Sequence, residues 1–540
     1  MRNDADAGTR AAGSSAATSP VGEATPSTSV EDAAAASPAL EQHLAWLKAF
    51  EAREGRPLRV LHVGNIANNA YLNAKFLRSV GVEAHVLSYD YRHVMATPEW
   101  EDVELLRDHG DDFTPRFSRR DLGSYRRPRW FVGGSLRVGA LRIAELCGAR
   151  IHRPRLVALL AIDRMVDSLT RLLRLGPRLS HALRLALISP SLFLLKLRHA
   201  LRSGPRAFAD EDAFRAAELV DRFAEAFPQR PDRLRAADIH LYLPAANILR
   251  PALEPYDIIQ CYATEPIYAL MSGKHPYVAF EHGTLRDFTM GDNALHRLTS
   301  LAYREADHTF ITNGDCLAYA ERLKIESYSP VVHPVDVEQH RQDFGDAIET
   351  LRGEIGGDVI LFCPIRHDWA VKGVDAHLRA LPLIKARLSG RLKLVLVRWG
   401  PDLAKSEALL ESLGCSFDVV WRRSMCRIAM IKHMRAADVV LDQMVLPPFG
   451  ATAPQAMAAG TLVVASYMPD STTWMIPEPA PILSAHSPEE VTEAVLRALE
   501  PGWRGEYETR ARVWVDRYHH PRNVIYDHLN VYRRVLGHER

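Results

Sequence analysis

Residues 58–88 have the sequence LRVLHVGNIANNAYLNAKFLRSVGVEAHVLS, and this stretch decides the fold class. It opens with an apolar, β-branched run that ends at Gly64, which is typical of a buried strand. A helical pattern follows over 71–80, Gly81 ends it, and 83–88 predicts the next strand. A strand, a glycine turn, a helix and a strand open a βαβ unit. We therefore expect a parallel sheet that binds ligands at the carboxyl ends of its strands.

The α/β pattern continues in two series. An amphipathic helix at 39–55 precedes the first series. Beyond 58–88, the first series predicts strands at 256–261, 277–280, 307–312 and 331–336, and a helix at 313–323. The second series predicts strands at 359–363, 392–397, 419–420, 439–441 and 461–465, with helices at 373–387, 406–413, 427–436, 455–459 and 488–500. A linker near 337–350 separates the two series, and a helical tract over 507–537 ends the pattern.

These patterns divide the 540 residues into four parts. Residues 1–40 are rich in Ala, Ser, Thr, Gly and Pro, so we expect a disordered tail. Residues 41–340 predict a Rossmann-like domain with a helical insertion at 116–235. Residues 341–506 predict a second Rossmann-like domain, and 507–540 a final helix.

A local excess of positive charge marks residues 116–206, which hold 20 Lys and Arg against 4 Asp and Glu. The net charge of the whole chain is only +1, so no partner is indicated by the total. Arginines recur at helical spacing between apolar residues, as at Arg164, Arg171, Arg174 and Arg178. Two interpretations stay open: an insertion whose arginines are simply solvated, or a surface that docks on an anionic membrane. No nucleic-acid partner is predicted.

Several classes of protein are disfavoured by the composition. The six cysteines include no C-x-x-C pair, and no histidine cluster has zinc-ligand spacing, so we expect reduced thiols and no metal site. The start of the chain lacks the pattern of a secretory signal. The longest uncharged apolar stretch, 185–195, contains Pro190 and is too short to span a bilayer. We predict a cytoplasmic protein, peripheral on the inner membrane face if the basic region docks there.

Two cations follow the first strand of the second series. Arg366 comes just after 359–363, and Lys372 precedes Gly373 and the next helix. A guanidinium and an ammonium beside free backbone amides would neutralise a diphosphate. They would also stabilise the charge that a leaving diphosphate gains in a transition state. The alternative is a pair of solvated surface cations.

Residues 447–460, PPFGATAPQAMAAG, form the second candidate segment. Gly450 and Ala451 open a helix of small residues that a ligand could approach closely. Gln455 lies in its first turns, where its amide could bond two vicinal hydroxyls. The alternative is a helix whose small side chains serve only close packing.

Two candidates lie in the first series. His282 follows a predicted strand, and a neutral imidazole there could bond a sugar hydroxyl or stabilise a reacting centre. Gly64 and Asn68 in the first glycine turn could approach an acceptor or a phosphate. The G-x-G-x-x-G spacing is absent, so a dinucleotide site is unsupported. A histidine after a strand also commonly has a structural role.

The layout resembles the retaining glycosyltransferases of the GT-B fold, in particular the large family four. The likeness covers about 57–115 and 250–537. It rests on Arg366 with Lys372-Gly373, Ala437-Asp-Val-Val, Phe449-Gly450, 456–465, Glu281-His-Gly-Thr284, His333-Pro-Val-Asp336 and the last helix, which ends at 531–536. The resemblance implies two Rossmann-like domains facing across a cleft, with a final helix that crosses back to the first domain.

The roles implied by the resemblance follow the motifs. Arg366 and Lys372 would bind the diphosphate, the segment behind Gly450 would offer amides to it, and His282 would contact the donor sugar. The family normally has two glutamates flanking seven residues, where this chain has Pro447 and Gln455. A subgroup with Asp-Gln before this motif, similar to Asp442-Gln443 here, also lacks the first glutamate. A neutral glutamine would hold ribose hydroxyls more weakly than a carboxylate.

The sequence thus predicts a retaining, metal-independent glycosyltransferase. Its donor would be a nucleotide diphosphate sugar and its acceptor a glycan or glycolipid, in envelope or exported polysaccharide synthesis, without a further cofactor. The rival hypothesis, motivated by Pro447 and Gln455, is a GT-B-shaped protein that has lost catalysis and serves as a binding or scaffolding subunit. An epimerase or a phosphorylase of similar fold is a third class, and no cofactor-lysine site for a phosphorylase is identified.

Overall fold

The computed structural model describes residues 38–90, 93–113, 115–150, 153–172, 182–183, 186–187, 210–446 and 448–537. Residues 36–540 belong to one compact unit, which contains two separate sheets. The predicted tail falls outside the described residues except for 38–40, which begin the first helix. Most of the basic region beyond 172 also falls outside them.

The first sheet has seven parallel strands in the order β3-β2-β1-β4-β5-β6-β7. Their bounds are β1 Arg59–Val63, β2 Glu83–Tyr89, β3 Phe131–Gly134, β4 Ile258–Tyr262, β5 Tyr277–Phe280, β6 His308–Ile311 and β7 Tyr328–Pro330. The chain winds outward from β1 in one direction and then from β4 in the other. The carboxyl ends of β1 and β4 therefore form a topological switch point, where ligands bind in such sheets.

The second sheet repeats this winding with six parallel strands in the order β10-β9-β8-β11-β12-β13. Their bounds are β8 Val359–Cys363, β9 Leu392–Val397, β10 Val419–Arg422, β11 Val439–Leu441, β12 Leu462–Ala465 and β13 Leu483–Ser484. Its switch point lies between β8 and β11. The prediction of two Rossmann-like α/β sheets is confirmed.

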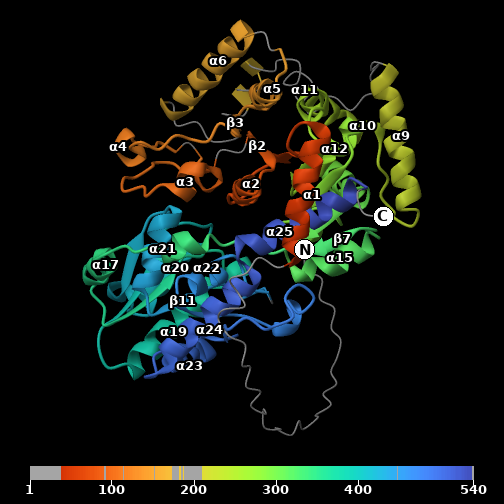
Figure 1. Cartoon of the computed structure of the whole chain (residues 1–540). Coiled ribbons are helices and arrows are strands. Elements are labelled where there is room, and N and C mark those ends of the chain that lie inside the picture. Colours follow the sequence, from red (N-terminus) through yellow and green to blue (C-terminus); the bar gives the residue numbers. More distant parts are fainter. Residues whose placement is uncertain are drawn as a thin grey trace, which may run out of the picture. The chain divides into compact units, whose positions relative to one another are not determined.

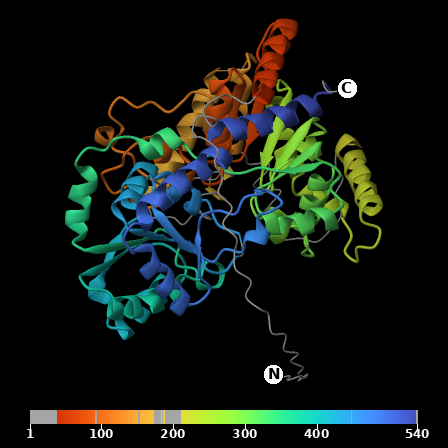
Figure 2. The ribbon, with the colours of Figure 1, turned by 60° about the horizontal axis from the view of Figure 1, so that its bottom comes forward.

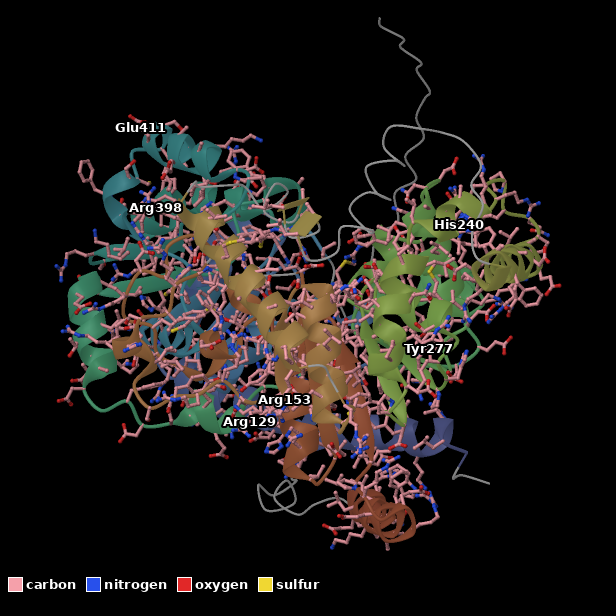
Figure 3. All side chains as sticks on the ribbon, turned by 90° about the horizontal axis from the view of Figure 1, so that it is seen from above. Arg129, Arg153, His240, Tyr277, Arg398 and Glu411 are labelled. Carbon is pink, nitrogen blue, oxygen red and sulfur yellow. The ribbon has the colours of Figure 1, made fainter. Side chains whose placement is uncertain are left out.

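Helices connect the strands and cover both faces of the sheets. In the first half they are α1 Pro38–Glu54, α2 Asn69–Ser79, α3 Pro98–Asp102, α4 Arg119–Leu122, α5 Leu136–Leu146, α6 Arg153–Leu172, α9 Asp210–Ala226, α10 Ala236–His240, α11 Leu243–Leu253, α12 Pro266–Ser272, α13 Thr284–Asp287, α14 Ala294–Arg304 and α15 Leu317–Arg322. In the second half they are α16 Val337–Arg341, α17 Ala347–Ile355, α18 Trp369–Lys372, α19 Val374–Arg387, α20 Leu403–Ser412, α21 Arg427–Ala436, α22 Thr452–Ala458, α23 Pro488–Ala498, α24 Trp503–Tyr518 and α25 Pro521–Val535. Figure 3 shows His240 and Tyr277 in the first half, and Arg398 and Glu411 in the second.

Alternation along the strands builds separate cores on the two faces of the first sheet. In β1, Val60 packs in a core with α1, α2 and α25, whereas Leu61 packs in a core with α5, α11 and α12. Successive side chains of a strand point to opposite faces, so a strand buried on both sides is almost wholly apolar. The second sheet has its own core, which includes Phe362, Val440 and Val464.

The last helix leaves the second half and packs on the first. Helix α24 contacts α22 and β12, and α25 contacts α1 and α2 (Figures 1 and 2). Leu529 and Tyr532 are buried there, and the Tyr532 hydroxyl donates to Gln260 Oε1 at 2.6 Å. The single helical tract predicted for 507–537 is therefore two helices, and the second one lies against the first sheet.

Three sequence expectations differ from the structure. The predicted helical insertion at 116–235 also supplies β3, the edge strand beside β2. The strand predicted at 331–336 is absent, because β7 ends at Pro330, before that segment. The linker near 337–350 holds α16 and the start of α17. Among the described helices, none is long and apolar enough to cross a membrane.

Candidate active site

A pocket lies between the two halves, at the carboxyl edges of both sheets. The first half contributes residues that follow β6 and β7, namely Thr312, Asn313, Gly314, Val332 and His333. The second half contributes the segment before α22 and two later stretches, namely Pro448, Phe449, Gly450, Ala451, Pro454, Thr472, Met475, Ile476 and His519. The sequence predicted a gap of this kind at the carboxyl ends of the strands.

Two histidines, His333 and His519, line this pocket, and a third, His282, stacks on His333. The rings of His282 and His333 are stacked, with their centroids 5.6 Å apart and their planes inclined by 4°. His519 Nδ1 bonds the carbonyl oxygen of His333 at 3.0 Å. The predicted residue His282 thus lies behind His333. His333 was part of a motif that carried the resemblance but had no predicted role, and His519 was not suggested by the sequence.

All three imidazoles are held neutral at pH 7. Burial lowers the pKa of His333 and of His519 to about 4, and it lowers the pKa of His282 well below its usual range. One buried nitrogen on each ring lacks a hydrogen-bond partner among the described residues: His282 Nε2, His333 Nδ1 and His519 Nε2. Buried polar atoms are usually paired, so three unpaired nitrogens beside one pocket mark a place for a polar ligand.

A buried carboxylate fixes the loop that carries Asn313. Glu281 is fully buried and its Oε2 accepts hydrogen bonds from Asn313 Nδ2 at 3.0 Å and from Thr312 Oγ1 at 3.2 Å. Cys316 Sγ donates to the other carboxyl oxygen at 3.2 Å. The motif Glu281-His282 therefore has two functions in this fold, since the first residue shapes the pocket wall and the second lies beside it.

The predicted cations lie at the switch point of the second sheet. Arg366 follows β8, is 41% exposed and pairs with Asp368 at 2.9 Å. Lys372 ends α18 rather than beginning a helix, and Gly373 separates it from α19. The Lys372 ammonium makes no salt bridge with any described residue, so its charge is available to a ligand.

Asp442 connects Lys372 to the glycine segment. The carboxyl of Asp442 is buried, which raises its pKa, and the positive charge of Lys372 together with backbone N–H groups of Gly450 and Ala453 opposes that rise. The carbonyl oxygen of Lys372 accepts from Met444 N at 2.8 Å. The structure therefore brings together Lys372 and Gly450 as predicted. Pro447, which stands where the family that the sequence resembles has its first glutamate, lies outside the described residues.

Gln455 has a partner that the sequence did not suggest. Its Oε1 accepts a hydrogen bond from a terminal nitrogen of Arg427, which uses one of the two lone pairs of that oxygen. Arg427 also donates from Nε to Glu101 Oε1 at 2.9 Å. The NH₂ group of Gln455 and the second lone pair of its carbonyl oxygen are left for a ligand.

The first glycine turn also differs from the prediction. Asn68 is fully buried, and its side chain accepts from Asn65 at 3.0 Å and donates to the Thr97 carbonyl at 2.8 Å. It therefore holds the loop together and offers nothing to a ligand. Gly64 has φ 87°, and a Cβ there would lie 2.9 Å from Glu265 Cγ, so this glycine is required by packing.

Glu265 is a residue that the sequence did not suggest. It follows β4 at the switch point of the first sheet, and the Tyr89 hydroxyl donates to it. Burial raises the pKa of Glu265 to about 7. The only sign of Glu265 in the sequence is an acidic residue shortly after the strand predicted at 256–261.

Within the described ranges, no group of three or more His, Cys, Asp or Glu side chains is placed to hold a metal. The six cysteines are free thiols, and five of them are buried.

Comparisons with known proteins relate parts of the chain to glycosyltransferases. Residues 357–501 match the family model described as "Glycosyl transferases group 1". A D-inositol 3-phosphate glycosyltransferase from Acidothermus cellulolyticus is 30% identical over 196 residues, which are 34% of this chain and 43% of that protein. The match therefore spans less than half of the relative's length.

Solved structures of low sequence identity also align with this chain. A glycosyltransferase from Rickettsia africae has a TM-score of 0.48 at 11% identity, covering 89% of this chain and 98% of its own. Anabaena HepE in complex with UDP-glucose has a TM-score of 0.45 at 16% identity, covering 53% and 81%. Sucrose-phosphate synthase from Thermosynechococcus elongatus has a TM-score of 0.44 at 16% identity, covering 55% and 80%.

Proposed function

We propose that this protein is a glycosyltransferase of the GT-B type that moves a sugar from a nucleotide diphosphate sugar to a glycan or lipid-linked acceptor. One observation carries the proposal. A pocket between two Rossmann-like sheets is lined by the neutral imidazoles of His333 and His519 and by the Gly450 segment. The charge of Lys372 acts on Asp442, whose carboxyl accepts from the Gly450 backbone. The match of 357–501 to group 1 glycosyl transferases supports it independently.

The residues divide the work of such a transfer. Lys372, Arg366 and the amides near Gly450 would hold the diphosphate, whose negative charge grows as its bond to the anomeric carbon breaks. The neutral rings of His282 and His333 would bond the sugar. A hydroxyl oxygen of the acceptor forms the new bond to the anomeric carbon, and its proton passes to the released diphosphate. We propose retention of configuration on the resemblance of the motifs alone.

Two measurements test the proposal. Calorimetry with UDP, GDP and ADP should detect binding of at least one nucleotide. Incubation with a panel of tritiated nucleotide sugars and lipid extracts should then give transfer or donor hydrolysis. Absence of both reactions across the panel, together with absence of nucleotide binding, would refute the enzyme assignment.

A second candidate is a GT-B-shaped binding protein without catalysis. It is favoured by one observation, which is that a neutral Gln455 bonded to Arg427 stands where the family that the sequence resembles normally has a glutamate. This candidate predicts no turnover of any donor even when a nucleotide binds. Binding with donor hydrolysis would exclude it.

Membrane association is a separate proposal. The basic region 116–206 would dock on anionic lipid at the cytoplasmic face, which would place the enzyme near a lipid-linked acceptor. Within the described part of that region, α6 is amphipathic and carries Arg153 and Arg164. The role that we propose for the protein in envelope or exported polysaccharide synthesis depends on this docking.

A further inference from the structure

The two halves also meet where α3 of the first half packs on α21 of the second. The acids at this contact come from the first half and the bases from the second. Glu101 pairs with Arg427 and Glu104 pairs with Lys432 at 2.6 Å. A small apolar cluster of Val94, Trp100 and Cys426 lies beside them.

Arg427 is the centre of this contact. It is only 8% exposed, and it bridges two residues that are remote from each other in sequence. Its Nε donates to Glu101 Oε1 at 2.9 Å, and a terminal nitrogen donates to Gln455 Oε1. A buried guanidinium needs a negative partner, and Glu101, which is 2% exposed, supplies that charge from the other half.

Glu101 is itself fixed by the protein. Its backbone carbonyl accepts from Gln339 Nε2 at 2.8 Å, and α3 holds it against α21. The position of Arg427 therefore depends on how the first half sits on the second. The same contact sets the orientation of the Gln455 amide.

The bond from Arg427 determines which way the Gln455 amide faces. A guanidinium only donates, so it must meet the carbonyl oxygen, and the NH₂ group is left to donate elsewhere. Gln455 lies one turn of α22 beyond Ala451 and next to Pro454, both of which line the pocket. Gln455 itself is half-buried and does not line the pocket, so its free NH₂ would donate to an oxygen of a ligand that extends past Pro454.

We propose that Glu101 is a positioning residue for the donor, acting through Arg427 on Gln455. This inference rests on the proposed function and names the part of the first half on which donor binding depends. Because glutamine is neutral, Arg427 must take its counter-charge from Glu101. A glutamate at position 455 would neutralise Arg427 within the second half, and Glu101 would then become dispensable.

The test compares two acids on the same surface. Glu101→Gln should weaken binding of the best nucleotide from UDP, GDP and ADP by about fivefold or more, which is the lower range of coupling between sites. The matched control is Glu104→Gln, which removes the neighbouring ion pair but has no link to Gln455, and which should change the dissociation constant by less than about twofold. Thermal unfolding of both variants monitors any general loss of structure.

A rescue experiment separates positioning from a structural role. In the Glu101→Gln background, adding Gln455→Glu should restore nucleotide affinity to within about twofold of the Gln455→Glu single variant. If Glu101→Gln fails to fold, Glu101→Asp provides the milder change, since it keeps the charge and shortens its reach.

The outcomes are distinguishable from those of the proposed function. Equal effects of Glu101→Gln and Glu104→Gln, or no rescue by Gln455→Glu, would overturn the positioning role while leaving nucleotide binding intact. Failure of the unaltered protein to bind any of the three nucleotides would overturn both. A selective loss with rescue supports the role of Glu101.

Discussion

Gly314 offers the sharpest test of how closely the two halves approach at the pocket. A Cβ at this position would lie 2.1 Å from the carbonyl oxygen of Ser471 and 3.8 Å from Met475 Sδ. Carbon and oxygen atoms in contact are about 3.3 Å apart, so Gly314→Ala would force the two backbones apart by roughly 1 Å. The Ser471 carbonyl oxygen belongs to the backbone, so it cannot move away by a rotamer change as a flexible side chain could.

The expected cost follows from this overlap. Overpacking of a tight contact typically destabilises a protein by about 1–3 kcal/mol, unless the two walls separate to relieve it. Separation would widen the pocket between Asn313 and the 471–476 segment. Urea unfolding should therefore show a loss of stability, and calorimetry should show weaker nucleotide binding.

The matched control is Gly353→Ala in α17. A Cβ there meets nothing within 4 Å, and the position is an ordinary helix interior. The change should leave nucleotide binding unaltered and raise the free energy of unfolding by about 0.5–1 kcal/mol. If Gly314→Ala matched the unaltered protein in both stability and affinity, the close approach of the two halves in this structure would be wrong.

Three further predictions concern charge and protonation. Lys372→Met should weaken binding of a nucleoside diphosphate much more than binding of the nucleoside, and an equal effect on both would remove Lys372 from the diphosphate site. Because burial holds the pKa of His333 near 4 against about 6.5 in an unfolded chain, the unfolded state binds more protons below pH 6.5. The free energy of unfolding should therefore fall as pH drops from 6.5 to 4, and His333→Asn should make that fall shallower; an unchanged slope would contradict the assignment. Binding to anionic vesicles should weaken as salt rises, because salt screens the basic region 116–206, and salt-insensitive binding would exclude electrostatic docking.

Strands with a continuous apolar pattern were predicted well from the sequence. The strand predicted at 359–363 is β8, and that at 392–397 is β9, with the same bounds. The pattern was weaker at the sheet edges. Strand β3 ends in Gly133 and Gly134 and lies within an arginine-rich region, so its short apolar run was masked by its surroundings. Edge strands need less burial than central ones, and their sequences are correspondingly less regular.

The candidate site was predicted in part for the same reason. Arg366, Lys372 and Gly450 follow neighbouring parallel strands, and the carboxyl ends of parallel strands meet at one edge of a sheet. Spacing alone therefore indicated that they lie together. Spacing could not show that the hydrogen bonds of the Asn68 side chain are made within its own loop. Partners such as the Thr97 carbonyl depend on how the following segment folds back.

The sequence by itself determined two α/β windings, their order along the chain and the cations at the second switch point, since these depend on local periodicity and on residues near one another in the chain. The tertiary structure alone decided that His333 and His519 line one pocket with His282 stacked on His333, and that Glu101 reaches Arg427 across 326 residues. Such contacts form where two separately wound halves dock, and docking is set by the shape and charge of whole surfaces rather than by any pattern within one segment.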